Sequence, residues 1–470
     1  MTAPTQAESR TCGVAERIDE FGLPEESELV HSNDIALRNS LHALVASNPD
    51  FWNFEGTARR NFAHGYFQYP AMMVPNMVGH ALDQVAAHRL DRIHLLDPFA
   101  GSGTVVTEAV ARGWDVTAVD LNPLAVLLCR TKAGPFFPGA MARATAEVLA
   151  QARQTGTTAC HWFPNVRKWF EPQVIEDLSR LRRAIEDVEL PAARRFLWVA
   201  MAETVRVTSN SRLSTVKLHV KVPENRVPSD AVAAFARIAA RNLELLESET
   251  AALRESGYLR RGWPSSQATV VLGDAADVDA SKFRGRPNVL VTSPPYGDNH
   301  STITYGQHAF LPLQWIGFFD TGATDCSVLM QPTAIDSMSL GGRRRNGLER
   351  AESLGNKSES ASVTLRRLTR IRRDHANKVG AFLSDLDRAL NSAMRALAHG
   401  SHIVVTVGDR TVSRTRIPTA RIVQDMVTAR GAVVIAAIPR RLPASRRMAS
   451  RNSFAPRMDT EWMLVMRLLP

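Results

Sequence analysis

The chain has 470 residues, 44% of them hydrophobic, and a formal net charge of +10. This length allows two or three domains, or one elaborated domain, with a substantial core. No run approaches the roughly 18 apolar residues of a membrane helix, and the polar N-terminus lacks the order of a secretory signal. We therefore expect a cytoplasmic protein without a membrane segment, and the positive charge favours a polyanionic partner without proving one.

Cysteine usage sets a further limit. Cysteines stand at Cys12, Cys129, Cys160 and Cys326, without Cys-x-x-Cys spacing. This pattern predicts neither a zinc site nor a disulfide framework, so we expect no metal and a reducing compartment.

After a polar lead-in over residues 1–50, the clearest local pattern lies within residues 51–138. IHLLDPF is a short apolar run, AGSG is a turn, and TVVTEAVARG is a helix that ends at Gly113. WDVTAVD is a second strand ending at Asp120, and NPLAVLLCRTK begins a helix with Pro123 in its first turn. This order predicts a βαβ unit, so we expect an α/β fold with a doubly wound, mostly parallel sheet.

Residues 139–262 show mainly helical spacing, interrupted by the extended segment SRLSTVKLHVKVPENRVP. Strand patterns return within residues 263–470, in ATVVLGDA, NVLVTSPPY, SHIVVTVGD, AVVIAAIP and EWMLVMRLL. Residues 335–375 are rich in Ser, Gly and Arg. We expect a flexible basic loop there, leading into one long helix from about residue 361 to 399.

The turn DPFAGSGT, residues 97–104, joins the first strand to its helix. Its glycines let backbone N–H groups approach a ligand, although such a turn can also be purely structural. Asp120 follows about 20 residues later, where a carboxylate can accept both hydroxyls of an adenosine ribose. Dinucleotide enzymes share this layout. Asp97, however, would repel a pyrophosphate and suits the cationic amino acid end of S-adenosylmethionine, which we therefore expect as the cofactor.

The tetrapeptide SPPY, residues 293–296, directly follows the strand NVLVT. Two prolines have a fixed φ and no N–H, so the turn is stiff and leaves the Pro294 carbonyl available as an acceptor. Ser293 and that carbonyl can hold an amino group by both of its hydrogens. Tyr296 offers a ring to stack on a base drawn out of a duplex. The alternative is a Pro-Pro turn that merely ends a strand.

Together these elements resemble the amino-methyltransferases of bacterial restriction–modification systems, whose motifs are D-P-F-x-G-S-G-T and [D/N/S]-P-P-[Y/F]. Other segments resemble further motifs of that family, in the right order: YPAMMVP (69–75), DLNPLA (120–125), GDA (273–275), VGDRTV (407–412), IPRRLPASRRM (438–448) and EWMLVM (461–466). The resemblance implies a Rossmann-like class I S-adenosylmethionine-dependent methyltransferase fold. Residues 51–138 and 263–470 would form its cofactor-binding and catalytic halves, with a helical insertion at 139–262.

The resemblance also implies a role for each matching residue. Cofactor binding would fall to Tyr69, Pro70, Asp97, Pro98, Phe99, Ala100, Gly101, Ser102, Gly103, Thr104, Asp120, Leu121, Asn122, Asp274 and Ala275. The catalytic residues would be Ser293, Pro294, Pro295 and Tyr296. Because a hydroxyl is a poor base at neutral pH, we expect Ser293 to orient the amine, not to deprotonate it.

The target base is less strongly determined. Within the family the Ser form of the tetrapeptide is associated mainly with cytosine N4 and the Asp form with adenine N6. This favours cytosine N4 and leaves adenine N6 open. Cytosine C5 is disfavoured, because no Pro-Cys nucleophile motif is present.

Double-stranded DNA is the expected partner. The family resemblance also allows a cognate restriction endonuclease as a partner, for which the sequence contains no signal. Candidate DNA contacts are Arg212, Lys217 and Lys221 in the insertion, a candidate target-recognition region, and Arg343, Arg344 and Arg345 in the basic stretch. For any one of these residues a solvated charged surface is the alternative.

Three rival functions share some of these features. A tRNA guanine-N2 methyltransferase with a similar Pro-Pro-Tyr loop stays open, although such proteins usually carry an RNA-binding domain before the cofactor motif. A catalytically silent DNA-binding scaffold is disfavoured because Asp97, the loop glycines and the Pro-Pro pair are intact. A nucleotide-dependent oxidoreductase is disfavoured by SPPY and by the charge of Asp97.

Overall fold

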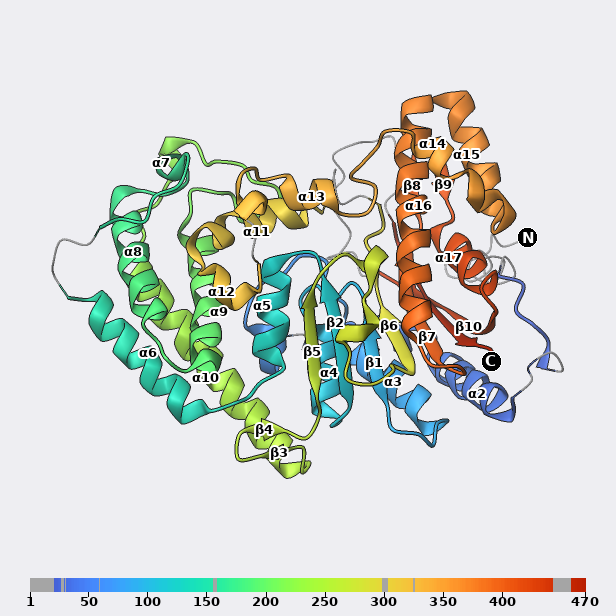
Figure 1. The fold of residues 1–470 in the computed structure, drawn as a ribbon, viewed down its shortest axis with the longest axis horizontal. Coiled ribbons are helices and arrows are strands. Elements are labelled where there is room, and N and C mark those ends of the chain that lie inside the picture. Colours follow the sequence, from blue (N-terminus) through green and yellow to red (C-terminus); the bar gives the residue numbers. More distant parts are fainter. Residues whose placement is uncertain are drawn as a thin grey trace, which may run out of the picture.

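A seven-stranded sheet forms the centre of this computed structural model (Figure 1). The structure describes residues 21–26, 29, 31–58, 60–154, 159–297, 303–323, 326–442 and 458–470. The strand order across the sheet is β10-β11-β7-β6-β1-β2-β5, and β11 runs antiparallel to both of its neighbours. The strands of this sheet are β1 His94–Asp97, β2 Asp115–Asp120, β5 Ala268–Leu272, β6 Val289–Thr292, β7 His402–Gly408, β10 Ala432–Arg441 and β11 Thr460–Leu468.

The strand order confirms the expected fold class. Strands β1, β2 and β5 extend in one direction from the centre, and β6, β7, β11 and β10 extend in the other. The chain therefore winds twice, as in Rossmann-like class I methyltransferases, and it switches direction between β1 and β6. Open α/β sheets bind their ligands at such a switch point, beyond the carboxyl ends of the strands.

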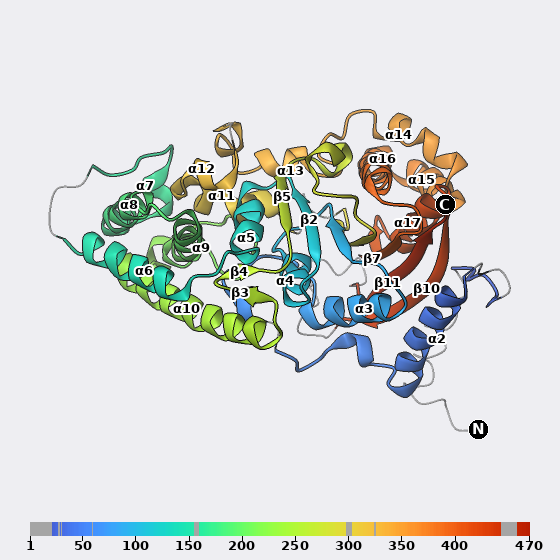
Figure 2. The same ribbon diagram turned by 60° about the horizontal axis from the view of Figure 1, so that its bottom comes forward.

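Helices cover both faces of the sheet, which explains why its strands are nearly continuous apolar runs. Alternate residues face opposite sides: Leu95 packs with α3 and α4, whereas Leu96 packs with α16 and α17. Figure 2 shows α3 and α16 on opposite sides of the strands. The larger helices are α2 Ser32–Ser47, α3 Pro75–Ala87, α4 Thr104–Ala111, α5 Pro123–Lys132, α6 Pro138–Ala152, α8 Pro172–Glu186, α9 Pro191–Thr208, α10 Ala231–Glu255, α11 Tyr305–Trp315, α15 Glu359–Ile371, α16 Arg373–Ala396 and α17 Thr419–Thr428.

The expected helical insertion is present as a bundle of α6, α8, α9 and α10 beside α5 (Figure 1). Its core is continuous with that of α5 and α11, and includes Phe196 and Trp198, each 1% exposed. Shorter elements complete the chain: α7 Val166–Trp169, α12 Phe318–Thr321, α13 Ala334–Met338, α14 Gly347–Arg350, and the hairpins of β3 Leu259–Arg260 with β4 Trp263–Pro264 and of β8 Arg410–Val412 with β9 Thr415–Ile417.

The prediction for residues 335–375 was wrong in two respects. Instead of a flexible loop, the segment contains α13, α14 and the short turn Glu352–Asn356, and it buries Leu340 and Leu354. Paired glycines allow α14 to pack closely on α16, since a Cβ on Gly380 would come within 2.6 Å of the Gly347 carbonyl oxygen. The expected long helix is two helices, because Arg372 between them has an extended conformation (φ −163°, ψ 103°).

Two expectations extend beyond the described residues. Residues 443–448 of the tail motif and residues 1–20 of the polar lead-in lie outside them. Within the described ranges, no helix combines the length and apolar character needed to cross a membrane.

A buried ionic cluster ties α2 to the sheet. Asp34, 0% exposed, accepts a hydrogen bond from Arg467 of β11 at 3.0 Å and lies 3.5 Å from Nε2 of His402 of β7. Arg89 donates to Nδ1 of the same imidazole at 2.8 Å, which leaves the ring proton on the side of Asp34. Burial raises the pKa of Asp34, but the bonds from His402 and Arg467 outweigh it and leave the pKa below its ordinary value.

Removal of this carboxylate should destabilise the fold. Asp34→Ala leaves the Arg467 guanidinium without its carboxylate and the buried His402 N–H without an acceptor, so we expect the free energy of unfolding to fall by about 3 kcal/mol in urea titrations. The exposed Asp374→Ala variant is the control, with a change within about 0.5 kcal/mol. Because the folded pKa is depressed, the contribution is complete above the ordinary value of 3.8 and is lost as the pH falls through the folded pKa. Equal loss in both variants would contradict the structural role of Asp34.

Candidate active site

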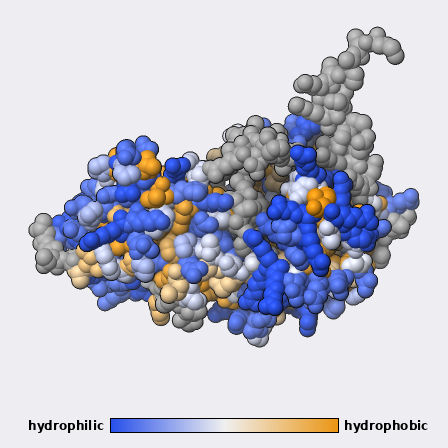
Figure 3. Space-filling model, turned by 90° about the horizontal axis from the view of Figure 1, so that it is seen from above, coloured by the Kyte–Doolittle hydropathy of each residue, from blue (hydrophilic) through white to orange (hydrophobic). Residues whose placement is uncertain are grey.

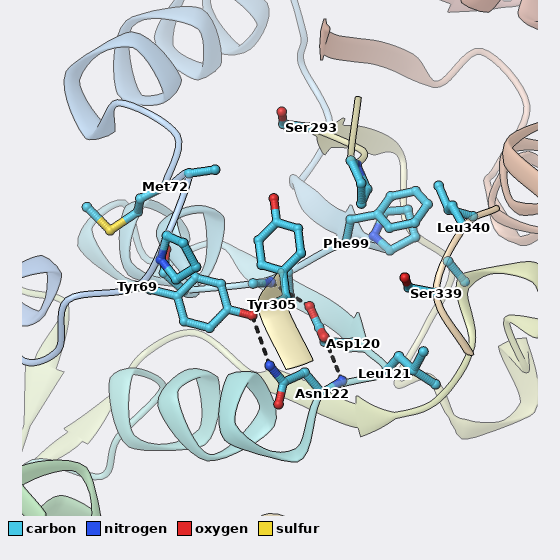
Figure 4. A pocket seen from close by; sticks show the side chains of 18 of the residues that line it. Tyr69, Met72, Phe99, Asp120, Leu121, Asn122, Ser293, Tyr305, Ser339 and Leu340 are labelled. Carbon is cyan, nitrogen blue, oxygen red and sulfur yellow. Dashed lines mark hydrogen bonds between the residues drawn. The ribbon is translucent and has the colours of Figure 1, made fainter. Parts of the chain in front are cut away.

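A cavity that is partly open to solvent, with about 850 Å³ of empty space, lies at the carboxyl ends of β1, β2 and β6 (Figure 4). The cavity is lined by Tyr69, Pro70, Ala71, Met72, Met73, Pro98, Phe99, Ala100, Gly101, Ser102, Thr104, Asp120, Leu121, Asn122, Asp274, Ala275, Ser293, Pro295, Tyr305, Ile335, Ser339 and Leu340. It thus brings together the predicted cofactor residues other than Asp97 and Gly103, and two residues of the predicted catalytic tetrapeptide.

The glycine loop after β1 forms the floor of this cavity. Gly101 and Gly103 have φ values of 50° and 74°, which L side chains rarely adopt, and Gly103 stands directly before α4. A Cβ on Gly103 would lie 3.1 Å from the sulfur of Cys129, so this glycine also allows close packing on α5. The N–H of Gly101 donates to Oδ2 of Asp120 at 2.7 Å and joins the loop to the end of β2.

Asp120 lies at the end of β2, where its carboxylate faces the cavity. Its Oδ1 accepts from the N–H of Asn122 at 2.8 Å, and the Asn122 side chain in turn donates to the Tyr69 hydroxyl at 3.2 Å. Burial raises the pKa of Asp120 to about 6, although these backbone N–H groups oppose the shift. These backbone hydrogen bonds hold the Asp120 carboxylate in place where it lines the cavity, so that it can accept hydrogen bonds from a ligand.

Asp97 lies behind the loop and is fully buried. Its Oδ1 accepts from the Thr292 hydroxyl at 2.7 Å and from the N–H of Phe99 at 3.1 Å. Its Oδ2 has no hydrogen-bond partner among the described residues. Burial raises the pKa of Asp97 to about 7. A buried carboxylate oxygen without a partner is costly, and a cationic ligand nearby would stabilise its charged form.

The tetrapeptide leaves the sheet at the end of β6. Ser293 and Pro295 face the cavity, whereas Pro294 is buried and Tyr296 is not among the lining residues. The Tyr296 hydroxyl donates to Oε1 of Glu461 at 3.1 Å and lies 3.4 Å from Oγ of Ser293. Stacking of a base on Tyr296 stays a prediction.

Sequence reasoning missed one wall of the cavity, which consists of Tyr305, Ile335, Ser339 and Leu340. Tyr305 begins α11 and stacks on Tyr69, with ring centroids 6.0 Å apart. Asp336 holds this helix end by accepting from the N–H groups of Gly306 and Gln307 at 2.9 and 3.2 Å. Neither α11 nor α13 carries a motif, so the sequence offered no signal for these residues.

The predicted DNA contacts lie outside the cavity, in two separate segments. Arg212, Lys217 and Lys221 belong to the loop between α9 and α10, and this loop touches α11 through the Leu218 N–H, which donates to the Gln307 side chain at 3.2 Å. Arg343, Arg344 and Arg345 are exposed and follow the cavity-lining Leu340 by only a few residues. No cluster of three or more metal-ligating side chains occurs in the part of the chain that the structure describes.

Comparison with known proteins agrees with the sequence resemblance. A family model described as "Conserved hypothetical protein 95" matches residues 74–159. The type II methyltransferase M.MvaI from Kocuria varians is 26% identical over 441 residues, which cover 91% of this chain and 94% of that protein. This chain is thus similar to a type II methyltransferase over nearly its whole length. The resemblance drawn from the motifs is thereby confirmed.

Two solved structures of the rRNA methyltransferase aviRa from Streptomyces viridochromogenes also align with this methyltransferase. They match 85% of this chain and 86% of theirs, at 13% and 14% identity, with TM-scores of 0.28 and 0.27. At such scores the strand order, not this alignment, identifies the fold.

The raised pKa of Asp97 predicts that this methyltransferase gains stability when the charge is removed. An asparagine keeps one oxygen for Thr292 and Phe99 but cannot ionise. The cost of ionising Asp97 is absent below its ordinary pKa of 3.8 and grows until about pH 7. Asp97→Asn should therefore be about 1–3 kcal/mol more stable than wild type at pH 8, and show no such gain at pH 4.

Urea unfolding of the ligand-free protein at both pH values measures this difference. The exposed Asp50→Asn variant should show no pH-dependent gain. A destabilised Asp97→Asn protein at pH 8 would show that the buried carboxylate is satisfied in the fold.

Proposed function

We propose that this methyltransferase transfers a methyl group from S-adenosylmethionine to the exocyclic amine of a DNA base, with cytosine N4 as the favoured target. One observation carries the proposal: Ser293 faces the same cavity as the glycine loop and Asp120. A group suited to hold an amine thus lies beside groups suited to hold the cofactor. The identity to a type II methyltransferase over most of both chains supports the same activity.

The cavity residues fit S-adenosylmethionine. Asp120 would accept the ribose hydroxyls, and Asp274 with Ala275 would border the adenine at the next strand end. The unpartnered Oδ2 of Asp97 suits the cationic end of the cofactor, where its charge would be stabilised. When bound, the cofactor supplies an electrophilic methyl group on a positively charged sulfur.

The tetrapeptide would hold the target amine. An exocyclic amine is a weak nucleophile because its lone pair is delocalised into the ring. If Ser293 Oγ and the Pro294 carbonyl each accept one N–H, the nitrogen becomes more pyramidal and its lone pair is localised. When the nitrogen takes the methyl group, the bond between the methyl carbon and the sulfur would break, S-adenosylhomocysteine would leave as a neutral thioether, and the nitrogen would release one of its protons to water. Positioning, not a strong base, would therefore supply most of the rate enhancement.

The basic stretch beside the cavity is the favoured DNA contact. Arg343 and Arg344 are exposed, and their guanidinium groups have no ion-pair or hydrogen-bond partner among the described residues. Arg350 of the adjacent α14, in contrast, is paired with Asp385 at 3.0 Å. Lys221 already donates to the Ser209 carbonyl, which makes it a weaker candidate. Figure 3 views this face of the molecule, where hydrophilic side chains lie on both sides of the centre.

The first test is methyl transfer itself. Wild-type protein incubated with radiolabelled S-adenosylmethionine and unmethylated genomic DNA should label the DNA, and nucleoside mass spectrometry should detect N4-methylcytosine. Ser293→Ala should lower kcat by about 100-fold or more because the amine loses an acceptor. Asp97→Ala should mainly weaken cofactor binding.

The alternatives give different products. Detection of N6-methyladenine would support the same mechanism, with adenine instead of cytosine as the target base. Label in tRNA or rRNA with none in DNA would overturn the DNA proposal. Full activity of Ser293→Ala would exclude the proposed role of the tetrapeptide.

The proposed phosphate contacts predict a salt effect. The double variant Arg343→Ala/Arg344→Ala should bind DNA more weakly, and the slope of log K against log salt should fall by about 0.9 for each lost phosphate contact. Arg254→Ala/Arg260→Ala is a matched control, because these exposed arginines lie at the opposite end of the molecule, near β3. Fluorescence anisotropy at several salt concentrations measures both. An equal change in the two double variants would mean that net charge alone matters.

A further inference from the structure

The side chain of Tyr296 ends in a defined hydrogen-bonded chain. Its hydroxyl lies 3.1 Å from Oε1 of Glu461 and 3.4 Å from Oγ of Ser293. A carboxylate is an acceptor only, so the single phenolic proton is directed to Glu461. Burial and the neighbouring Glu461 charge raise the pKa of Tyr296 well above its ordinary value, which keeps that proton in place.

This arrangement settles the direction of the second contact. Since the Tyr296 proton is committed to Glu461, the Ser293 hydroxyl must be the donor to the Tyr296 oxygen. A serine hydroxyl has one proton and two lone pairs. With its proton directed at Tyr296, Ser293 presents lone pairs to the cavity and can accept an N–H. A free serine hydroxyl would instead rotate and donate in a fraction of its orientations.

Glu461 is itself held from both neighbouring strands. It pairs across the ladder with Arg440 of β10, and the two form an ion pair in which the arginine side chain is 4% exposed. Nε of Arg440 is fixed by the Trp52 carbonyl at 2.9 Å. On the other side Glu461 faces Gly408 of β7. A Cβ on Gly408 would lie 2.2 Å from the Met458 sulfur and 3.1 Å from the Tyr296 ring, so the absence of a side chain there makes room for both residues.

We propose that Glu461 is a positioning residue of the methyl transfer, which acts through Tyr296 to keep Ser293 oriented as an acceptor for the target amine. This inference rests on the proposed function. In the Asp form of the tetrapeptide, the first residue is a carboxylate, which can only accept hydrogen bonds from the amine. The inference explains how a serine at the same position can also act as an acceptor. The carboxylate comes from the last strand of the sheet instead of from the tetrapeptide.

The test is a double-mutant cycle with separate kcat and KM values. Tyr296→Phe keeps the ring and the Glu461–Arg440 pair but removes the link to Ser293. Glu461→Gln leaves one side-chain oxygen for two donors, Tyr296 and Arg440. Each single variant should lower kcat about 10- to 100-fold with little change in the KM for S-adenosylmethionine. The double variant should be no slower than the slower single variant, because both changes break the same chain.

Controls separate positioning from folding. The exposed Asp459→Asn, close to Glu461 in sequence, should leave kcat unchanged. In Tyr296→Phe, the melting temperature and the calorimetric affinity for S-adenosylhomocysteine should stay near the wild-type values. If Glu461→Gln is unstable, the kcat of Tyr296→Phe alone tests the inference. Independent effects that multiply in the double variant, or a Glu461→Gln protein that loses stability while kcat is retained, would overturn the inference. A wild-type protein that methylates no nucleic acid would overturn the proposed function beneath it.

Discussion

Parallel pairing of β1 with β2 on one side and with β6 on the other determines where chemistry can occur in this molecule. Asp97 is opposite Ala118, two residues before Asp120, and Leu96 is opposite Leu290, two residues before Thr292. These registers bring the three strand ends to the same edge. The glycine loop, Asp120 and the tetrapeptide then meet there, and two direct contacts hold them together: the Gly101 N–H donates to Asp120, and the Thr292 hydroxyl donates to Asp97.

Two buried carboxylates of this chain, those of Asp34 and Asp97, differ in how completely their oxygens are hydrogen-bonded. Asp34 has two donors beside it, the Arg467 guanidinium and the His402 imidazole, and stabilises the attachment of α2. Asp97 is equally buried, but it is held by a hydroxyl and one N–H and keeps an oxygen without a partner. The first arrangement serves the fold. The second costs the fold stability, because a buried carboxylate oxygen stays without a partner among the described residues.

Local patterns in the sequence predicted most of the sheet, the insertion and the floor of the cavity. The glycine loop and SPPY each combine a strand end with residues of special backbone geometry, so they can be recognised within eight residues or fewer. Tyr305 of α11 and Leu340, just after α13, escaped prediction because a tertiary contact brings α11 and α13 together, the Asp336 carboxylate at the start of α11. The pairing of Arg440 with Glu461 depends on the register of two antiparallel strands.

Composition was a poor guide to residues 335–375. Serine, glycine and arginine usually indicate a mobile surface segment, yet here Gly347 and Gly380 permit a close helix contact that composition cannot reveal.

The insertion between β2 and β5 also has a consequence for how the chain folds. These strands pair from Val116–Ala268 to Asp120–Leu272, so the whole bundle of α6 to α10 lies within the loop that this pairing closes. Loop-closure entropy grows slowly with length, by about 0.6 kcal/mol for each doubling, so the insertion costs little at equilibrium. Rates respond differently, because distant contacts slow folding. Local helix packing in the bundle shortens the effective loop, and β5 can then join the sheet edge as a late step.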